Sequence, residues 1–448
     1  MASRGRCAPL SPLGPALALL AVLPAFVAGQ ETSLTLAQAL EMAGRRNPEV
    51  LAARERAAAQ HRRAEAVARS VWPRLSLSTS WSHSDTPSTV FAQKLNSGEF
   101  TQEDFAISRL NAPGALSHQT TVASLEFPVD AFGRVRAQER GQSATGRVAD
   151  AQAREAVQEL RLRVVEAYRR AVLARRAASV TEGALLGARA READMEARVA
   201  EGAALVADLL RVRTRRRQRE AELAEQRGDV SIAGAVLARL VGADPGTVYE
   251  PTEEPLPPAP VDEDAGAWAV RALEHRPALE VARQRLDAAR WAVRGEQRSR
   301  LPDVALYGQL QDDRSAFSGG GQSGTVGASL RWSAFDPARG KRLAAASADL
   351  AAAELDARAA ADQVRLEVET AWHRARAARE RYLAAKGGAE EGREALRVVQ
   401  ERRRAGKATL TDELQTEAAA LAAELGEIRA VAEAVLADSA LRRAAGEL

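Results

Sequence analysis

The chain has 448 residues, of which 4% are aromatic and 27% charged, and long stretches rich in Ala, Arg, Glu and Leu favour extended helices over a compact mixed core. Its 63 basic and 60 acidic residues are interspersed, which is typical of solvated helix faces. This balance argues against a nucleic-acid surface, and no nucleic-acid partner is expected.

Residues 1–29 have the features of a signal peptide. Basic residues precede an apolar stretch at 16–27 that is too short to span a bilayer, and small residues follow it. We expect cleavage near Gly29. The single cysteine, Cys7, precedes the apolar stretch, so the mature chain would not be lipidated and would contain no disulfide or cysteine metal site.

From residue 30 onward the sequence is a tandem repeat. "NPEVLAARERAAA" from Asn47 resembles "RPALEVARQRLDA" from Arg276, and "SLEFPVDAFGRVRA" from Ser124 resembles "SLRWSAFDPARGKRL" from Ser329. Between these landmarks the first copy is longer by about two dozen residues. The predicted divisions are a first repeat at 30–243, a proline-rich linker at 244–264 and a second repeat at 265–448.

Each repeat is predicted to run as helix, strand, loop, strand and long helical hairpin. The opening helices span about 35–70 and 264–299, and each stops before a proline. Period-two alternation of apolar and polar residues predicts strands close to the roughly 9 to 11 residues of a tilted membrane strand. Their expected bounds are about 72–84 and 119–129 in the first repeat, and about 302–312 and 324–333 in the second.

The rest of each repeat has the three- and four-residue apolar spacing of long helices, at about 134–241 and 338–444. Weak points lie near 180–188 and at Gly387-Gly388, and there we expect the chain to fold back on itself. Helices of this length with narrow apolar stripes need neighbours on both sides, as in a coiled-coil array.

The strands favour a membrane β-barrel that several chains share. No later segment is apolar over the roughly 18 residues of a membrane helix, but an exported chain can enter a membrane as a barrel of alternating strands. Four strands cannot close alone, because open edges leave unpaired amides in lipid, whereas three chains would supply 12 strands. Aromatic residues within or next to the strands suit the membrane interface, with plain packing as the alternative: Trp72, Trp81, Tyr307 and Trp332.

With these features in order and in duplicate, the chain resembles the TolC-like outer-membrane factors, the channels of bacterial multidrug pumps and type I secretion systems. "SLTLAQALEMAGRRNPEVLAAR" at 33–54 is similar to the opening of that family, and "FPVDAFGRVRA" and "AFDPARGKRL" are similar to its strand-to-helix turns. The resemblance implies a mixed α and β membrane protein in the Gram-negative outer membrane. Such a protein is a homotrimer whose 12-stranded β-barrel continues into a long periplasmic α-helical coiled-coil barrel. The implied partners are outer-membrane lipid, a periplasmic adaptor protein and an inner-membrane transporter of the RND, ABC or MFS type.

The resemblance also assigns residues to the tips of the two helical hairpins. The family carries Arg-x-x-x-Gly near each tip and an acidic residue further on, a pattern that "RVAEGAALVADLL" and "RRRAGKATLTDEL" match. In these segments glycine would let another helix approach closely, or would merely relax the helix near its turn. The candidate adaptor-docking residues are Gly202, Ala203, Gly406 and Lys407.

A periplasmic gate is the second role implied by the resemblance. Under three-fold symmetry an acidic residue inside each tip would form a ring of three like charges that attracts cations, and solvated helix acids are the alternative. The candidate gate residues are Asp208, Asp412 and Gln415, of which Gln415 replaces the second aspartate of some relatives.

No enzyme signature is present. The five histidines never fall at metal-ligand spacing with nearby acids, and "GGGQSG" at 319–324 lacks the lysine of a phosphate-binding loop. We therefore expect no catalytic site, cofactor or metal, and a passive export duct opened by an adaptor and a transporter. A periplasmic adaptor with long coiled-coil hairpins is the alternative, and a soluble coiled-coil scaffold is a third hypothesis. No motif specifies the exported substrate.

Overall fold

The computed structural model describes residues 32–244, 247, 249–252, 263–315 and 318–448, so the expected signal peptide and most of the expected linker lie outside the described residues. The first repeat contains β1 (Thr32–Leu34), α1 (Leu36–Arg46), α2 (Pro48–Ala68), the 3-10 helix η1 (Arg69–Val71), β2 (Arg74–Ser84), α3 (Pro87–Asn96), the 3-10 helix η2 (Gln102–Phe105), α4 (Ile107–Asn111), β3 (Leu116–Val129), α5 (Arg134–Ala200), α6 (Val206–Leu240) and β4 (Tyr249–Pro251). The second contains α7 (Ala265–His275), α8 (Pro277–Arg298), β5 (Asp303–Ser315), β6 (Ser318–Arg331), α9 (Arg339–Arg404) and α10 (Leu410–Ala445).

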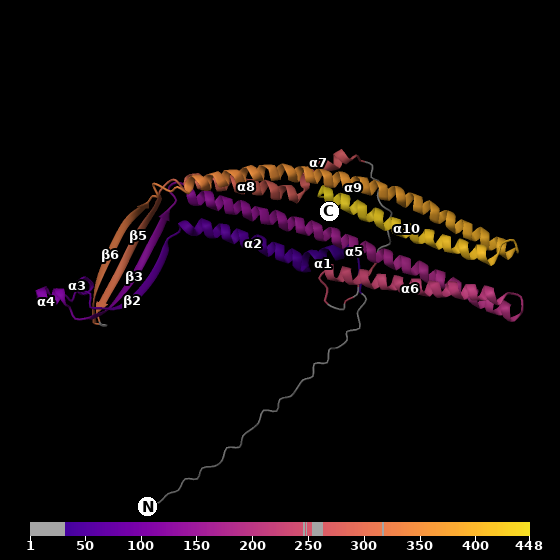
Figure 1. Ribbon diagram of the computed structural model, residues 1–448, viewed down its shortest axis with the longest axis horizontal. Coiled ribbons are helices and arrows are strands. Elements are labelled where there is room, and N and C mark those ends of the chain that lie inside the picture. Colours follow the sequence, from indigo (N-terminus) through magenta and orange to yellow (C-terminus); the bar gives the residue numbers. More distant parts are fainter. Residues whose placement is uncertain (1–31, 245–246, 248, 253–262, 316–317) are drawn as a thin grey trace, which may run out of the picture.

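The molecule is elongated, with a four-stranded sheet at one end and two helical hairpins at the other (Figure 1). α5 and α6 form the hairpin of the first repeat, and α9 and α10 form that of the second. A short parallel pair, β1 and β4, lies beside the middle of the helical part. Within the described residues, no helix is both long enough and apolar enough to cross a membrane.

Both opening helices are divided in two, which corrects the expectation of continuous helices over 35–70 and 264–299. The breaks fall at Asn47 and Arg276, each followed by a proline that starts the next helix. Proline suits the first position of a helix and has no N–H for the preceding helix. At the first break the side chain of Asn47 accepts a hydrogen bond from the backbone N–H of Glu49 over 2.9 Å, and so caps α2.

The fold-back points expected near 180–188 and at Gly387-Gly388 are wrong, because α5 and α9 run unbroken through both. A glycine inside a helix costs only about 1 kcal/mol, and buried neighbours such as Leu185 and Ala389 hold these segments in place. The chain instead turns at 201–205 and 405–409, so each hairpin has one long and one short arm.

The four long strands form an antiparallel sheet in the order β2-β3-β5-β6, so β3 and β5 join the two repeats. Their bounds differ from the expected ones by a few residues: Trp72 lies before β2, and Trp332 lies just after β6. Register places one set of apolar side chains on a single face, most of them exposed in the isolated chain. This apolar face consists of Leu75, Leu77 and Trp81 of β2, Ala123, Leu125 and Phe127 of β3, Val304, Leu306 and Leu310 of β5, and Val326, Ala328 and Leu330 of β6.

The opposite face of the sheet is polar, because side chains alternate along each strand. It carries Ser76, Ser78, Ser80 and Ser82 of β2, His118, Thr120 and Ser124 of β3, Gln309, Gln311 and Asp313 of β5, and Gly321, Thr325 and Ser329 of β6. Tyr307 also lies on this polar face, opposite Gly327, where an added Cβ would meet its Oη at 2.6 Å. The expectation that Tyr307 belongs to the lipid interface is therefore corrected, whereas Trp81 lies on the apolar face.

Each strand-to-helix turn is held by an aspartate. Asp130 accepts hydrogen bonds from the backbone amides of Val135 and Arg136, both over 3.0 Å, at the start of α5. Asp336 accepts from the amide of Ala338 over 2.9 Å and from Arg342 over 2.7 Å at the start of α9. The hydrogen bond from Arg342, with that of the Ala338 amide, lowers the pKa of Asp336. The repeated turn thus satisfies backbone donors that a helix start leaves free.

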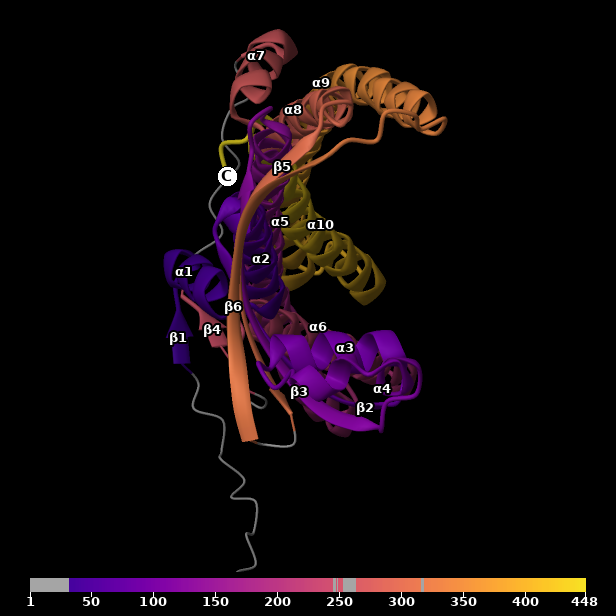
Figure 2. The same ribbon diagram turned by 90° about the vertical axis from the view of Figure 1, so that its left-hand side faces the viewer.

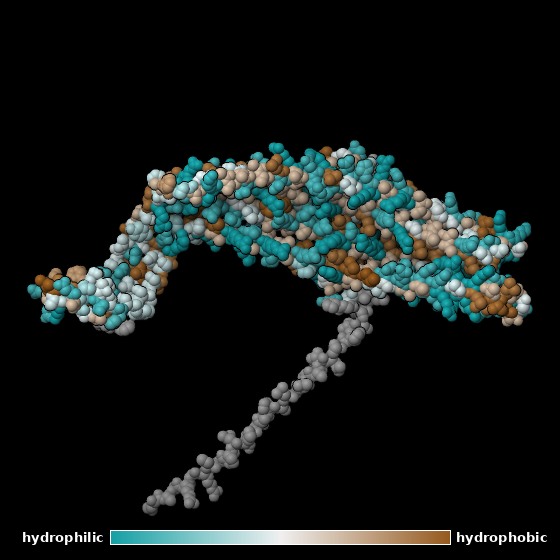
Figure 3. All heavy atoms as spheres, in the orientation of Figure 1, coloured by the Kyte–Doolittle hydropathy of each residue, from teal (hydrophilic) through white to brown (hydrophobic). Residues whose placement is uncertain are grey.

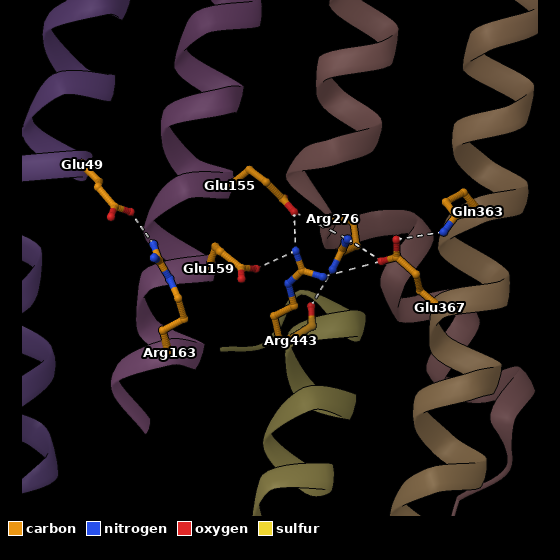
Figure 4. Close-up of polar contacts among 8 residues, drawn as sticks. All are labelled: Glu49, Glu155, Glu159, Arg163, Arg276, Gln363, Glu367 and Arg443. Carbon is orange, nitrogen blue, oxygen red and sulfur yellow. Dashed lines mark hydrogen bonds and ion pairs between the residues drawn. The ribbon is translucent and has the colours of Figure 1, made fainter. Parts of the chain in front are cut away.

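The two repeats meet in the middle of the helical part at a cluster of arginines and glutamates (Figure 4). Arg276 donates to Glu367 of α9 over 2.8 Å and lies 3.6 Å from Glu155 of α5. Arg443, near the end of α10, lies 3.1 Å from Glu155 and 3.0 Å from Glu159. Because Glu155 and Glu159 belong to the first repeat and the others to the second, this arginine cluster joins the repeats.

Candidate functional site

The two hairpin tips have the same turn. Gly202 follows the end of α5 and Gly406 follows the end of α9, each with a φ of +69°. The next residue donates its backbone N–H back into the helix, from Ala203 to Arg198 and from Lys407 to Arg402, over 2.8 Å in both. This is the glycine-ended helix cap, in which a side chain other than glycine is strained. Glycine at these positions is therefore required by the turn itself.

The four candidate docking residues lie on the surface of the tips. Gly202, Ala203, Gly406 and Lys407 are all exposed, and a Cβ built on either glycine would meet nothing within 4 Å. The backbone of both turns is thus open to an approaching helix. The structure brings the four residues to one end of the molecule, at the turns of the two hairpins (Figure 1).

An apolar patch lies directly beside the first tip and was not predicted. Leu205, Val206 and Leu210 are each more than half exposed, and Figure 3 shows apolar residues gathered at this end. The second tip has no such patch: Thr409 stands at the position of Leu205, and Leu410 packs against a small core of Met195, Leu209 and Val212. An exposed apolar cluster on a soluble part of a protein marks an interaction surface.

The acidic gate candidates occupy equivalent positions in the first turns of α6 and α10. Asp208 forms an ion pair with Arg211 at 3.3 Å. Asp412 completes a capping box, accepting from the Thr409 hydroxyl over 2.7 Å and from its backbone N–H over 2.9 Å. These bonds, the hydroxyl first, lower the pKa of Asp412. Gln415 is exposed one turn further on. In the single chain both aspartates thus already have partners and stabilise helix starts.

A buried ion-pair cluster between the two hairpins was also not predicted. Arg191 of α5 pairs with Glu417 and lies 3.9 Å from Glu413, and Arg403 of α9 pairs with Glu413. Both glutamates belong to α10 and are buried. A comparison of the repeats could have revealed them, because Leu209 stands at the position of Glu413 and Val199 at that of Arg403. A charge that replaces an apolar residue at an equivalent buried helix position needs a charged partner.

The tips do not have the geometry of a metal site. Across the part of the chain that the structure describes, no group of three or more His, Cys, Asp or Glu side chains is arranged to hold a metal ion.

Comparisons with known proteins identify a family model and a relative that match this sequence. The family model described as "Outer membrane efflux protein" matches residues 36–243 and 268–447. The outer membrane efflux protein BepC of Brucella suis biovar 1 (strain 1330) is 24% identical over 289 residues, which cover 63% of this chain and 62% of that protein. The chain thus aligns with less than two thirds of that relative's length.

Two solved structures show the same fold. The CmeC outer membrane channel of Campylobacter jejuni has a TM-score of 0.78 at 15% identity, covering 92% of this chain and 85% of that one. The outer membrane protein VceC of Vibrio cholerae has a TM-score of 0.74 at 20% identity, covering 92% and 96%. Since the family model covers most of the sequence and both repeats, the chain belongs to the outer membrane efflux protein family.

Proposed function

We propose that this protein is the outer-membrane channel of a tripartite efflux pump or a type I secretion system, a passive duct that carries cargo without changing it chemically. The observation that carries the proposal is the sheet: one face is apolar and exposed, the other is polar, and the strands lead directly into long helices. A sheet of this kind suits a barrel wall between lipid and water.

The free strand edges support a trimer. β2 and β6 are the two edges of the sheet, and each presents unpaired backbone groups that lipid cannot satisfy. Pairing β6 of one copy with β2 of the next closes the sheet, and three copies give a 12-stranded barrel, an even number within the known range. The hairpins α5–α6 and α9–α10 of the three copies would then form a helical cylinder in the periplasm.

The distribution of aromatic residues supports an outer-membrane location. Trp72 and Trp332 lie at the end of the sheet nearest the helices, and Trp81 lies near the other end of the apolar face. That side of the sheet becomes polar at Thr79, Thr121 and Asp312, and Trp81 lies one step further out, level with Gln119 and Arg314. Tryptophans at both boundaries of an apolar band are typical of membrane barrels. Export by the signal peptide at 1–29, cleaved near Gly29 without lipidation, belongs to the same proposal.

The hairpin tips suit docking of a periplasmic adaptor that links the duct to an inner-membrane transporter of the RND, ABC or MFS type. The open glycine turns at Gly202 and Gly406 offer bare backbone, and Leu205, Val206 and Leu210 offer apolar area beside the first turn. A coiled-coil partner with small and apolar residues at its own tip would cover both features. The two tips offer different surfaces, so the partner would contact them unequally.

The entrance would be closed by contacts between the hairpins. The buried ion pairs of Arg191 with Glu413 and Glu417 hold α10 against α5 in this structure. Widening the entrance requires the second hairpin to move away from the first and these pairs to break. Asp208, Asp412 and Gln415 lie at the same end, where a trimer would place three copies of each around the opening.

The lipid-facing assignment can be tested with two adjacent residues. Leu77 lies on the apolar face and Ser78 on the polar face of β2. Leu77→Arg should destabilise the membrane-inserted trimer by about 2 to 4 kcal/mol, the cost of a cation at the bilayer midplane, whereas Ser78→Arg should have little effect. The loss of stability is measured as the fraction of trimer that survives heating before a mild-detergent gel. Equal effects of the two changes would contradict the assignment of faces.

The function itself is tested by fractionation and reconstitution of the full chain. A duct stays in outer membranes through high-salt washing, runs as a trimer in mild detergent and conducts ions in a planar bilayer. A periplasmic adaptor would be released by salt or would fail to conduct. Release from membranes together with absence of conductance would exclude the proposed function.

A further inference from the structure

The segment 85–115, which connects β2 to β3, is a folded insert rather than an open loop. It contains α3, η2 and α4, whereas in the second repeat β5 ends at Ser315 and β6 begins at Ser318. Phe100 stacks edge-to-face against Phe91 at 4.7 Å and against Phe105 at 5.0 Å between ring centroids. Lys94 pairs with Asp104 at 2.7 Å. The insert therefore has its own small core and a defined shape.

This insert packs on the polar face of the sheet. Gln93 donates to Ser82 over 2.9 Å, Glu99 bonds to Ser315, and a Cβ on Gly321 would overlap the backbone oxygen of Asn96. Ser82, Ser315 and Gly321 all lie on the polar face.

Two further residues of that face are buried at the same end of the sheet. His118 is 3% exposed, Asp313 is 2% exposed, and their side chains are hydrogen-bonded over 2.8 Å. Burial of such a polar pair in an otherwise exposed sheet shows that this end of the polar face is covered. The neighbouring contacts of α3 with β5 and β6 identify the insert as the cover.

Because the insert packs on one face of the sheet, the orientation of that face in a closed barrel decides whether the insert lies inside or outside the wall. If the apolar face meets lipid, the polar face lines the lumen, and whatever packs on it lies inside the wall. Figure 2 shows α3 and α4 beside β2 and β3. The insert therefore lies within the outer mouth of the barrel, at the end far from the helices (Figure 1).

We propose that the inserts of three copies meet in the outer mouth of the duct and occlude it, with a second copy of the same insert as the partner of each. This inference rests on the proposed channel function. The contact surface is the apolar outer part of the insert, where Leu95, Phe105 and Ile107 are all more than half exposed (Figure 3). Each subunit carries one insert, so a three-fold axis brings three equivalent apolar surfaces together in a lumen lined with polar side chains.

The apolar contact gives the occlusion a physical mechanism. A constriction lined by apolar side chains resists wetting, and ions cross it poorly even when its radius admits water. Separation of the inserts would expose Phe105 and Ile107 to water, which keeps the resting arrangement closed. Such a second barrier lies at the opposite end of the duct from the helical tips.

A cross-linking experiment tests the contact between inserts. In a Cys7→Ser background, Ile107→Cys adds a single thiol at a site that is 75% exposed. Arg314→Cys is the matched control, because Arg314 is exposed at the same end of the sheet but points to its other side. Oxidation of the trimer in outer membranes should convert the Ile107→Cys chain to a covalent dimer and leave the control monomeric on a denaturing gel. Equal yields from the two variants would overturn the proposal.

Single-channel conductance tests whether the inserts occlude the outer mouth. Ile107→Asp should wet the contact, repel the neighbouring copies and raise single-channel conductance by about two-fold or more, whereas Arg314→Asp should leave it unchanged. A second variant, in which 87–113 are replaced by a short glycine-serine turn, should conduct at least as well as Ile107→Asp. Channels with unchanged conductance in both variants would overturn the occlusion. Absence of any channel, including from the unmodified chain, would instead overturn the proposed function.

Discussion

Arg276 and Asn47 occupy the same position in the two repeats, and each donates a hydrogen bond to a backbone carbonyl near the end of its hairpin's second helix. Arg276 reaches the carbonyl of Arg443 over 3.0 Å, and Asn47 reaches that of Leu240 over 3.0 Å. Asn47 is short and uses its remaining oxygen to cap α2. Arg276 is longer and extends into the arginine cluster, where it contacts Glu367 and Glu155 (Figure 4).

The burial of Arg276 predicts that its loss lowers the free energy of unfolding more than the loss of an exposed arginine does. The side chain of Arg276 is 3% exposed, whereas that of Arg163, which pairs with Glu49 at 2.6 Å, is 37% exposed. Arg276→Met should destabilise the chain by about 3 kcal/mol, because it removes the more buried of the two arginines that balance the charges of Glu155 and Glu367. Arg163→Met should cost about 0.5 to 1 kcal/mol, as expected for an exposed pair. Denaturant unfolding of the detergent-solubilised protein compares the two variants, and similar unfolding midpoints would show that burial does not set the cost.

The ion pairs between hairpins predict a change in gating. Glu413→Gln together with Glu417→Gln removes both carboxylates that hold Arg191, so the closed entrance loses stabilisation. A loss of about 1.4 kcal/mol would raise the ratio of open to closed channels about tenfold in bilayer recordings. Glu394→Gln is the matched control, because Glu394 pairs only with Arg397 of its own helix. An unchanged open fraction in the double variant would exclude these pairs from gating.

The two explanations for the tip glycines predict different results for two substitutions. At a φ of +69°, alanine is strained by about 1 to 2 kcal/mol, whereas asparagine tolerates this conformation better but adds a side chain. If Gly202 and Gly406 serve only the turn, the asparagine variants should keep adaptor binding and the alanine variants should weaken it. If docking needs bare backbone, both should weaken it. Binding is measured as in-cell cross-linking of the hairpin tips to the adaptor of the proposed pump.

The insert carries a pH-dependent contact outside the strands. A hydrogen bond from Lys94, with those from the backbone and hydroxyl of Thr101, lowers the pKa of Asp104 from 3.8 to about 2. Because the folded pKa is depressed, this contribution to stability is complete above pH 3.8 and is lost as the pH falls towards about 2. Amide hydrogen exchange in 87–105 should therefore accelerate over that range relative to the same segment of an Asp104→Asn variant. If the exchange rates of the unmodified chain and of the Asp104→Asn variant changed with pH in parallel, Asp104 would not be the group responsible.

Much of the fold could be predicted from local pattern. The duplicated prolines, the period-two runs and the repeated turn at Asp130 and Asp336 are properties of short segments, and the structure has strands and helices at each of them. The fold-back points were predicted wrongly because a glycine pair or a weak apolar stripe lowers helix propensity by little, and packing along a 67-residue helix outweighs it. The actual turns are marked by Gly202 and Gly406, where a positive φ is required.

The candidate site was predictable only where residues act within their own segment. Asp208 and Asp412 were assigned by the resemblance of the tip segments to the family pattern, and both lie in the first turn of a helix. Arg191 and Glu417 were missed because they are 226 residues apart and become neighbours only when the two hairpins pack together. The exposed patch at Leu205 was missed because an apolar residue near a helix start looks the same in sequence whether it is covered or not.

The sequence by itself determined that this chain is a tandem repeat with alternating strands and long helices, because periodicity and prolines are local features. Only the tertiary structure decided that the four strands form one sheet with β3 beside β5, so that their apolar sides fall on a single face. It also decided that the insert at 85–115 covers the polar face, since its partners Ser82, Ser315 and Gly321 belong to three different strands. Register and packing between distant segments set these relationships, and no short stretch of residues contains them.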